Sequence, residues 1–398
     1  TGLGLLGIGT TWQNIYFDNA VAPGTPVTIK LGKEYSLLTL AGGLSVQGLD
    51  ASGNPIGSLK AVDGGLLDLL VADNVIEFTF VPSNNSGPQA YSGVRISQGS
   101  VLSVAQNTKV FGAYYTQAGN INCAPIDANT NPNILDVLYG VEDLGLGVAS
   151  ATASVTDPWN AVDNDVNTYA QIARGVAVLN EASLTAVFKQ QATAGDELRI
   201  VFEVPANPVL SLSLLQGYTI QRYLGDVPVG AALSSTSSIL DLKLLGLLGG
   251  TTNKAVVIVA PFNQPYDRVK ISYGNVVGVL GNFTRIYDIS MKPTFNYGAD
   301  PNGDLTLCTT DSLVFNPMDA CTTYQVYTSA TGPDKLDTAN GLTFTLPRNI
   351  AVGSHTFYVQ AMRNGCEIGP RQAITIVLEK CSKACIVSNK MVTNRIKK

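Results

Sequence analysis

Short runs of alternating apolar and polar residues dominate the chain, which is the pattern of strands that bury one face. In the clearest run, Val75–Val81, the side chains of Ile76, Phe78 and Phe80 fall on the same face. Turn-forming stretches such as Asp50–Pro55 (DASGNP) separate the runs. We expect further strands at Trp12–Phe17, Val27–Leu31, Ser45–Leu49 and Val110–Tyr115. The first part of the chain is therefore predicted to be a β-sandwich.

Part of this pattern occurs twice. Residues 91–111 (YSGVRISQGSVLSVAQNTKVF) align with Tyr266–Tyr287 (YDRVKISYGNVVGVLGNFTRIY) at an offset of 266 − 91 = 175. Upstream, Gly43–Gln47 parallels Gly217–Gln221 at a slightly smaller offset, as loop insertions would produce. We therefore expect one sandwich type used twice. The shared apolar face predicts a core that buries most of Ile15, Ile29, Val46, Phe78, Val94, Ile96, Ile200, Ile220, Val269 and Ile271.

The last part of the chain changes character, with more Thr and most of the Cys. Four strand-like runs at hairpin spacing over about 80 residues suit an immunoglobulin-like (Ig-like) sandwich. The predicted organisation is a first sandwich at 1–118, a polar linker at 119–134, a second sandwich at 135–295, an Ig-like domain at 296–380 and a tail at 381–398.

The second sandwich has an opening, Leu135–Ala173, for which the first has no counterpart, because Thr1 lies past the place where it would fall. The first sandwich is therefore expected to lack its opening strand or two. Three explanations stay open: the sequence is part of a longer chain, the first copy has lost these strands, or a strand from another chain fills the gap.

An unpaired sheet edge is a template for another chain's strand. The tail contains strand-forming residues, with Ile386, Met391 and Ile396 as candidate anchors. Donation of this tail to the first sandwich of the next molecule would give a head-to-tail filament.

The composition of the chain limits the classes of partner that it can bind. Charged residues make up only 14% of the chain, the net charge is −5, and no basic stripe with interleaved aromatics is present, which argues against nucleic-acid binding. No apolar run is long enough to span a membrane, and the Leu-rich run Leu244–Leu248 is bounded by Lys243 and by Gly249-Gly250. We expect the partners to be copies of the chain itself or other surface proteins.

Six cysteines are spaced unevenly, and all are disulfide candidates: Cys123, Cys308, Cys321, Cys366, Cys381 and Cys385. An even number confined to a linker and one small domain fits disulfides in an oxidising compartment. Zinc is the alternative, but Cys381-x3-Cys385 has no matching second pair. Six cysteines allow 15 pairings, among which sequence cannot choose.

The segment Asn160–Ala170 (NAVDNDVNTYA) resembles the opening loop of galactose-binding-like jelly rolls, such as discoidin and carbohydrate-binding modules. In that family a similar AxDGxxxTxW segment wraps around a cation near the ligand rim. Here Asn164 stands in place of the Gly and Tyr169 in place of the Trp. The resemblance implies jelly-roll sandwiches and a role in glycan binding.

Both large copies also resemble tandem repeats of large secreted surface proteins of Bacteroidota that use the type IX pathway. The resemblance rests on the opening segment, the strand YDRVKI and the Leu-rich turn Asp241–Gly249, and in the Ig-like part on Thr356–Ala361 and Asn364–Cys366. It implies an all-β protein of two jelly-roll-like sandwiches followed by an Ig-like sandwich, secreted or on the cell surface, with a structural or adhesive role.

The best candidate site is Asp163, Asp165 and Asn167, whose alternating oxygens could converge on Ca²⁺, the only cofactor that the sequence suggests. The alternative is a turn held by side-chain-to-backbone hydrogen bonds. Trp159 and Tyr169 flank this loop and could stack on a sugar or pack against the sandwich.

Enzymatic chemistry has little support in the sequence. The only histidine, His355, lies inside a strand pattern, and no G-x-S-x-G segment is present. No P-loop or dinucleotide-binding fingerprint follows a strand. We therefore expect no enzymatic activity.

Overall fold

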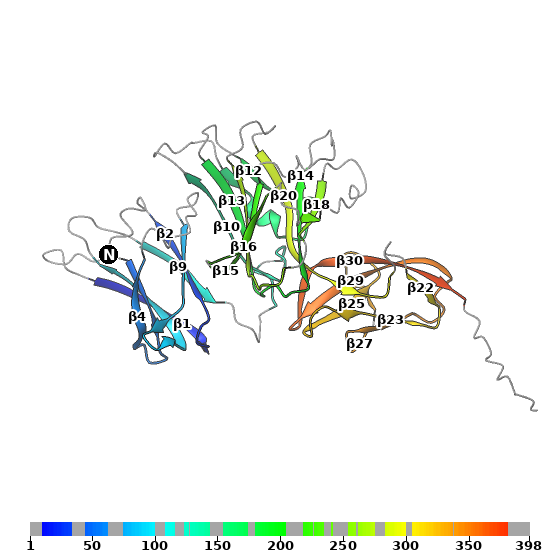
Figure 1. Ribbon diagram of the computed structural model, residues 1–398, viewed down its shortest axis with the longest axis horizontal. Coiled ribbons are helices and arrows are strands. Elements are labelled where there is room, and N and C mark those ends of the chain that lie inside the picture. Colours follow the sequence, from blue (N-terminus) through cyan, green and yellow to red (C-terminus); the bar gives the residue numbers. More distant parts are fainter. Residues whose placement is uncertain are drawn as a thin grey trace, which may run out of the picture. The chain divides into compact units, whose positions relative to one another are not determined.

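The computed structural model (Figure 1) describes residues 10–33, 44–62, 75–99, 108–115, 123–126, 128–143, 154–173, 180–203, 218–225, 227–234, 240–241, 254–259, 262–274, 283–299, 305–336 and 338–380. These residues form strands joined by turns, with one short 3-10 helix, η1 (Pro158–Ala161), among them. The described part contains no helix whose length and hydrophobicity would let it span a bilayer. The all-β class predicted from the sequence is confirmed.

The chain divides into two compact units. The first contains Thr1–Thr294 together with two short later segments, Met318–Thr322 and Met362–Pro370. The second contains Phe295–Pro317, Thr323–Ala361 and Arg371–Lys398.

The first unit begins with a sandwich of two antiparallel sheets, ordered β1-β8-β3-β4 and β5-β2-β9. Their strands are β1 (Thr10–Val21), β2 (Val27–Lys33), β3 (Leu44–Leu49), β4 (Pro55–Ala61), β5 (Val75–Phe80), β8 (Tyr91–Gly99) and β9 (Thr108–Tyr115), with a small hairpin of β6 (Ser83–Asn84) and β7 (Gly87–Pro88). Side chains from both sheets meet in one core, which includes Ile29, Phe78, Val46 and Val94.

The second sandwich repeats this plan with more strands, in sheets ordered β10-β13-β19-β15-β16 and β11-β12-β20-β14-β18-β17. The strands are β10 (Ile134–Asp143), β11 (Ser154–Thr156), β12 (Ala170–Ala173), β13 (Asn180–Phe188), β14 (Asp196–Glu203), β15 (Tyr218–Leu224), β16 (Val227–Ser234), β17 (Leu240–Asp241), β18 (Lys254–Val259), β19 (Arg268–Gly274) and β20 (Phe283–Pro293).

Strand β1 holds in the first sandwich the place that β13 holds in the second. Ile15 of β1 lies opposite Val94, and Ala186 of β13 lies opposite Val269, the residue that matches Val94 in the repeat. In the second sandwich β10 pairs outside β13, and β12 pairs outside β20. Over the described residues of the first sandwich, β1 has no strand outside it and is an end strand of its sheet, as are β4, β5 and β9.

The repeat predicts the core well. Nine of the ten residues expected on the shared apolar face are buried, from Ile29 to Ile271, with 4% or less of each exposed. Ile15 is the exception, since it is partly buried and packs at the margin of the core. Its strand is the end strand β1, where one side of the side chain has no neighbouring strand in the described sheet.

The strands of the Ig-like sandwich lie mostly in the second unit and form sheets ordered β22-β30-β29-β25-β26, β23-β28-β27 and β21-β24. They are β21 (Phe295–Asn296), β22 (Leu305–Cys308), β23 (Ser312–Val314), β24 (Asn316–Pro317), β25 (Thr322–Tyr327), β26 (Lys335–Leu336), β27 (Thr338–Ala339), β28 (Thr343–Thr345), β29 (Gly353–Arg363) and β30 (Cys366–Glu379). Rings of Phe295, Phe315 and Tyr324 pack together within it, with centroids 4.9–5.5 Å apart.

Candidate functional site

The predicted loop around Asp163 is a turn closed by its own side chains. Asp163 Oδ1 accepts a hydrogen bond from the Asp165 amide at 2.9 Å, and its Oδ2 accepts one from the Thr168 hydroxyl at 2.6 Å. Asp165 Oδ1 in turn accepts from the backbone and side-chain nitrogens of Asn167 at 2.9 and 2.8 Å. Partial burial raises the pKa of Asp163, and the Thr168 hydrogen bond opposes that rise.

Asn164 takes a backbone conformation that most residues adopt rarely. Its φ is 61°, a left-handed conformation that Asn adopts more readily than most residues. In this conformation its side-chain oxygen accepts a hydrogen bond from Asn131 Nδ2 at 3.0 Å. The loop therefore also fastens the segment that leads into β10.

Tyr169 packs against the outer face of the sheet that contains β14, β18 and β20. Tyr169 and Val166 cover an apolar cluster that includes Val201 and Tyr287, and the two tyrosine rings meet edge to face at 5.5 Å. The Arg285 guanidinium lies 4.5 Å from the centre of the Tyr169 ring. Tyr169 is thus partly buried in this cluster, and Trp159 in η1 is half-buried.

Within the described ranges, no three His, Cys, Asp or Glu side chains are grouped so that they could hold a metal ion. Both carboxylate oxygens of Asp163 and the Oδ1 of Asp165 accept hydrogen bonds from donors of their own loop. Calcium binding by Asp163, Asp165 and Asn167, and sugar stacking on Trp159 and Tyr169, stay predictions.

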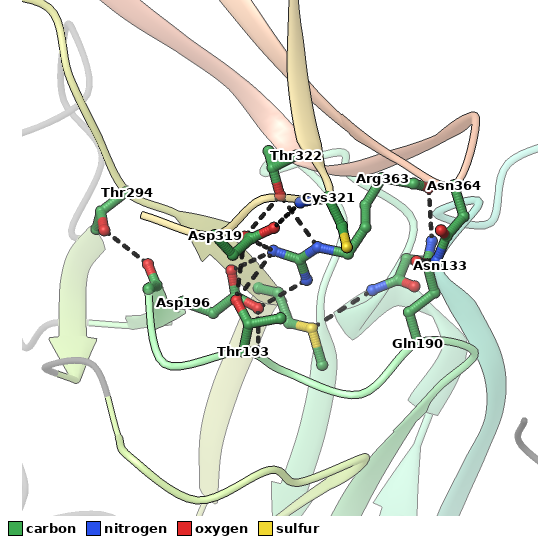
Figure 2. Close-up of polar contacts among 12 residues, drawn as sticks. Asn133, Gln190, Thr193, Asp196, Thr294, Asp319, Cys321, Thr322, Arg363 and Asn364 are labelled. Carbon is green, nitrogen blue, oxygen red and sulfur yellow. Dashed lines mark hydrogen bonds and ion pairs between the residues drawn. The ribbon is translucent and has the colours of Figure 1, made fainter. Parts of the chain in front are cut away.

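A second polar cluster, which the sequence did not indicate, surrounds the buried guanidinium of Arg363 (Figure 2). Arg363 donates two hydrogen bonds to the carboxylate of Asp196, both at 2.8 Å, and one to Asp319 at 3.0 Å. Thr322 and Thr193 accept further hydrogen bonds from it at 3.1 and 3.3 Å. Only 3% of the Arg363 side chain and none of the Asp196 side chain is exposed.

The hydrogen bonds of the Arg363 cluster compensate for the burial of its charges. Burial opposes the charged form of Arg363, but hydrogen bonds and charge from Asp196 outweigh it and raise the pKa of the guanidinium. Burial likewise works against ionised Asp319, yet the Thr322 hydrogen bond and the Arg363 charge hold its pKa below the usual value. The cluster is therefore a charged network inside the first unit.

Arg363 reaches this position from the end of β29, at a tight turn. The next two residues, Asn364 and Gly365, have φ values of 51° and 82°, which is the geometry of a two-residue hairpin connection. Gln190 donates to the Arg363 carbonyl at 3.2 Å and accepts from Asn364 Nδ2 at 3.1 Å. The Asn-Gly pair is the sequence signal for the turn, whereas nothing in the sequence marks Asp196 as the partner.

A disulfide joins Cys123 of the predicted linker to Cys366, the first residue of β30. The two cysteines are 243 positions apart in the sequence, and their Cα atoms are 5.0 Å apart. Lys189 donates to the carbonyl of Ala124, the residue after Cys123, at 2.5 Å. The linker is thus tied to the first unit by covalent and polar contacts.

The other predicted cysteines differ from one another. Cys308 is also disulfide-bonded. Cys321 is a free, exposed thiol, so the expectation that every cysteine is a disulfide candidate does not hold for it in this structure. Cys123 and Cys366 are bonded to each other, so neither can be the disulfide partner of Cys321. Cys381 and Cys385, like the tail anchors Ile386, Met391 and Ile396, lie outside the described residues.

A third polar cluster lies between the two sandwiches of the first unit. Arg268 of β19 donates to Thr28 of β2 at 2.8 Å and lies 3.5 Å from Glu77 of β5. Tyr114 of β9 donates to the same Glu77 oxygen at 3.0 Å. Nearby, Lys30 pairs with Asp136 at 2.8 Å.

Burial raises the pKa of Glu77 to about 7, and the positive charge of Arg268 only partly opposes this. Just 3% of Glu77 is exposed. The repeat contained a signal for this contact, because Arg268 stands in the second copy where the first has Gly93. Arg268 of β19 makes this contact with the first sandwich, and the equivalent strand β8 has no charged side chain at that position.

Residues 299–379 match the family described as "Ig-like domain CHU_C associated", in agreement with the Ig-like domain expected there. No curated protein matches the chain. Among solved structures, allantoicase from Saccharomyces cerevisiae is 10% identical, with 70% of this chain and 76% of allantoicase covered and a TM-score of 0.25.

The tandem CBM32-1 and CBM32-2 domains of ZmpB from Clostridium perfringens are 10% identical, with 71% of this chain and 82% of the ZmpB domains covered and a TM-score of 0.21. The adhesin domain of Epf from Streptococcus pyogenes is 7% identical, with 54% of this chain and 78% of the Epf domain covered and a TM-score of 0.19. We base no functional conclusion on similarities of this size. The family match is therefore that of residues 299–379, an Ig-like domain.

Proposed function

We propose that this chain belongs to an extracellular structural or adhesive surface protein that carries tension. The observation that carries the proposal is the disulfide between Cys123 and Cys366. Disulfides persist in oxidising compartments, and Cys308 forms another. This supports a location outside the cytoplasm.

The same disulfide changes the path that force takes through the chain. Tension that enters before Cys123 and leaves after Cys366 passes through the sulfur–sulfur bond and bypasses the residues between them. The second sandwich lies entirely within this bypassed part. Such a covalent shortcut suits a protein that is pulled.

Buried polar contacts support the same role. The Arg363 cluster lies beside the disulfide, since Cys366 follows Arg363 by three residues. The Arg268–Glu77 contact holds the two sandwiches together within the first unit. The charged side chains of both clusters form hydrogen bonds and ion pairs with other residues of the first unit.

Brief protease treatment of intact cells, followed by peptide mapping without reductant, tests the location and the disulfide together. We expect peptides of this chain to be released from the surface, with Cys123 and Cys366 in one linked peptide pair. Recovery of the chain only from the cytoplasm, with both cysteines reduced, would contradict the proposal.

We further propose that copies assemble head to tail into filaments by strand donation from residues 381–398. The end position of β1 in its sheet supports this. Electron microscopy of the protein beside a variant that ends at Lys380 tests it. We expect the full chain to form filaments and the shortened one not to; filaments unchanged by the truncation would contradict tail donation.

A further inference from the structure

The first part of the end strand β1, Thr10–Phe17, lacks the usual protection of a sheet edge. Natural edges are protected by charged side chains, especially Lys, or by Pro. The segment Thr10–Phe17 contains neither a charged residue nor a Pro, whereas the rest of β1 carries Asp18 and an irregular register between Tyr16 and Val21. The unprotected part of this edge is therefore Thr10–Phe17. The other end strands of the sandwich each carry one or more such residues: Pro55 and Lys60 in β4, Glu77 in β5 and Lys109 in β9.

The second sandwich shows what the edge of β1 can accept. There β13 pairs along its whole length with β10, from Ile134 opposite Phe188 to Asp143 opposite Asn180. Under this cover the inward residues Ala186 and Phe188 are fully buried. The corresponding residues of β1, Ile15 and Phe17, are only partly buried at the margin of their core. An added strand would complete their burial.

We propose that β1 accepts residues 384–390 of a second copy of the chain as an antiparallel strand. This proposal rests on the proposed head-to-tail assembly and names its acceptor and its register. The donor segment lies outside the described residues and follows β30, which ends at Glu379.

The register follows from the inward face of β1. Gln13 and Ile15 lie opposite the buried residues Ile96 and Val94 of β8, so their side chains share the inward face. Read backwards along β1, this face carries Phe17, Ile15, Gln13 and Thr11, which are two apolar residues followed by two polar ones. An antiparallel donor should show the same order at alternate positions.

Within 381–398 only one window has this order: Ala384, Ile386, Ser388 and Lys390. No window has the reverse order that a parallel donor would need. Ile386, one of the expected anchors, then lies opposite Ile15. On the outer face the donor would run beside Trp12 and Tyr16, which are 59% and 51% exposed. Met391 and Ile396 fall outside this register.

Disulfide trapping between two full-length proteins tests the proposal. One protein carries Gln13→Cys and the other Ser388→Cys, each with Cys321→Ser to remove the free, exposed thiol. After mixing and mild oxidation we expect a crosslinked dimer whose linked peptides contain positions 13 and 388. The matched control is Ser58→Cys, an exposed position on the opposite end strand β4.

A yield from the Gln13→Cys protein no higher than from the Ser58→Cys control would overturn the proposal. A chain that carries both Gln13→Cys and Ser388→Cys tests whether the donor strand comes from a second molecule. A crosslink within one chain at high dilution would overturn the proposal. Gln13→Lys, an inward charge at the edge, should abolish self-association in sedimentation, whereas Ser58→Lys should not.

The proposal and the assembly on which it rests can fail separately. Filaments without the 13–388 crosslink would show that assembly occurs through another acceptor and overturn the assignment of β1. A crosslinked dimer without filaments would support β1 as the acceptor and contradict the filament.

Discussion

Replacement of Glu77 by Gln should change how the stability of the first sandwich depends on pH. Glu77 is buried between the sandwiches, and its pKa rises from an ordinary value of 4.5 to about 7. The folded protein therefore holds the Glu77 proton more tightly than the unfolded chain does. The stability that this proton contributes is fully present below pH 4.5 and is lost as the pH rises through about 7.

The size of the effect follows from the two pKa values. Each pKa unit corresponds to about 1.4 kcal/mol, so the loss between pH 4.5 and neutral pH or above amounts to about 3 kcal/mol. Burial is the main cause of the raised pKa, followed by the opposing charge of Arg268, with smaller effects from Asp136, Tyr114 and Lys30. Gln cannot ionise, so Glu77→Gln should remove this part of the pH dependence.

The two tryptophans allow a clean assay, because Trp12 lies in the first sandwich and Trp159 in the second. With Trp159→Phe in both proteins, Trp12 fluorescence follows urea unfolding of the first sandwich from pH 4.5 to 8. We expect the Gln variant to gain about 3 kcal/mol relative to Glu77 across this range. Equal pH slopes for the two proteins would refute the reasoning, and Glu379→Gln, at an exposed position, serves as the control.

Three further changes test the core, the Arg363 cluster and the Asp163 loop. Arg363→Met leaves the buried carboxylate of Asp196 without its partner and should cost about 3–5 kcal/mol in urea unfolding; a cost below about 1 kcal/mol would contradict the network. Ile271→Ala should cost about 2–5 kcal/mol because the side chain is fully buried, and a much smaller value would mean that the strand packs differently. Asp163→Ala removes the hydrogen bonds from Asp165 and Thr168 and should lower the stability of the second sandwich by about 1–3 kcal/mol. Calcium that raises the melting temperature of the wild type but not of this variant would support the cation site as well as the turn.

The fold was largely predictable because the repeat shows the same apolar face twice. Residues such as Ile96 and Ile271 recur at equivalent positions with the period of a strand, so a buried face could be read directly from the sequence. Ile15 marks the limit of this reading. Periodicity gives the face on which a residue lies, but burial also depends on a neighbouring strand, and β1 is an end strand.

The polar clusters were harder to predict because their members are far apart in the sequence. Arg363 and Asp196 are 167 positions apart, and each alone looks like an ordinary surface residue. The same holds for the pairing of Cys123 with Cys366 among the pairings that six cysteines allow. For Arg268 the repeat holds a signal that the sequence analysis did not use, because the first copy has Gly93 at the equivalent position.

Force–extension measurement on single molecules tests the tension-bearing role most directly. A chain pulled from both ends should extend without releasing the residues between Cys123 and Cys366 while the disulfide is intact. Reduction should release the chain segment between the two cysteines, which are 243 positions apart, and add about 800–870 Å of contour length at 3.3–3.6 Å per residue. The Cys321→Ser protein should show the same gain, because Cys321 is a free thiol. An oxidised chain that already extends to the length of the reduced one would contradict the account.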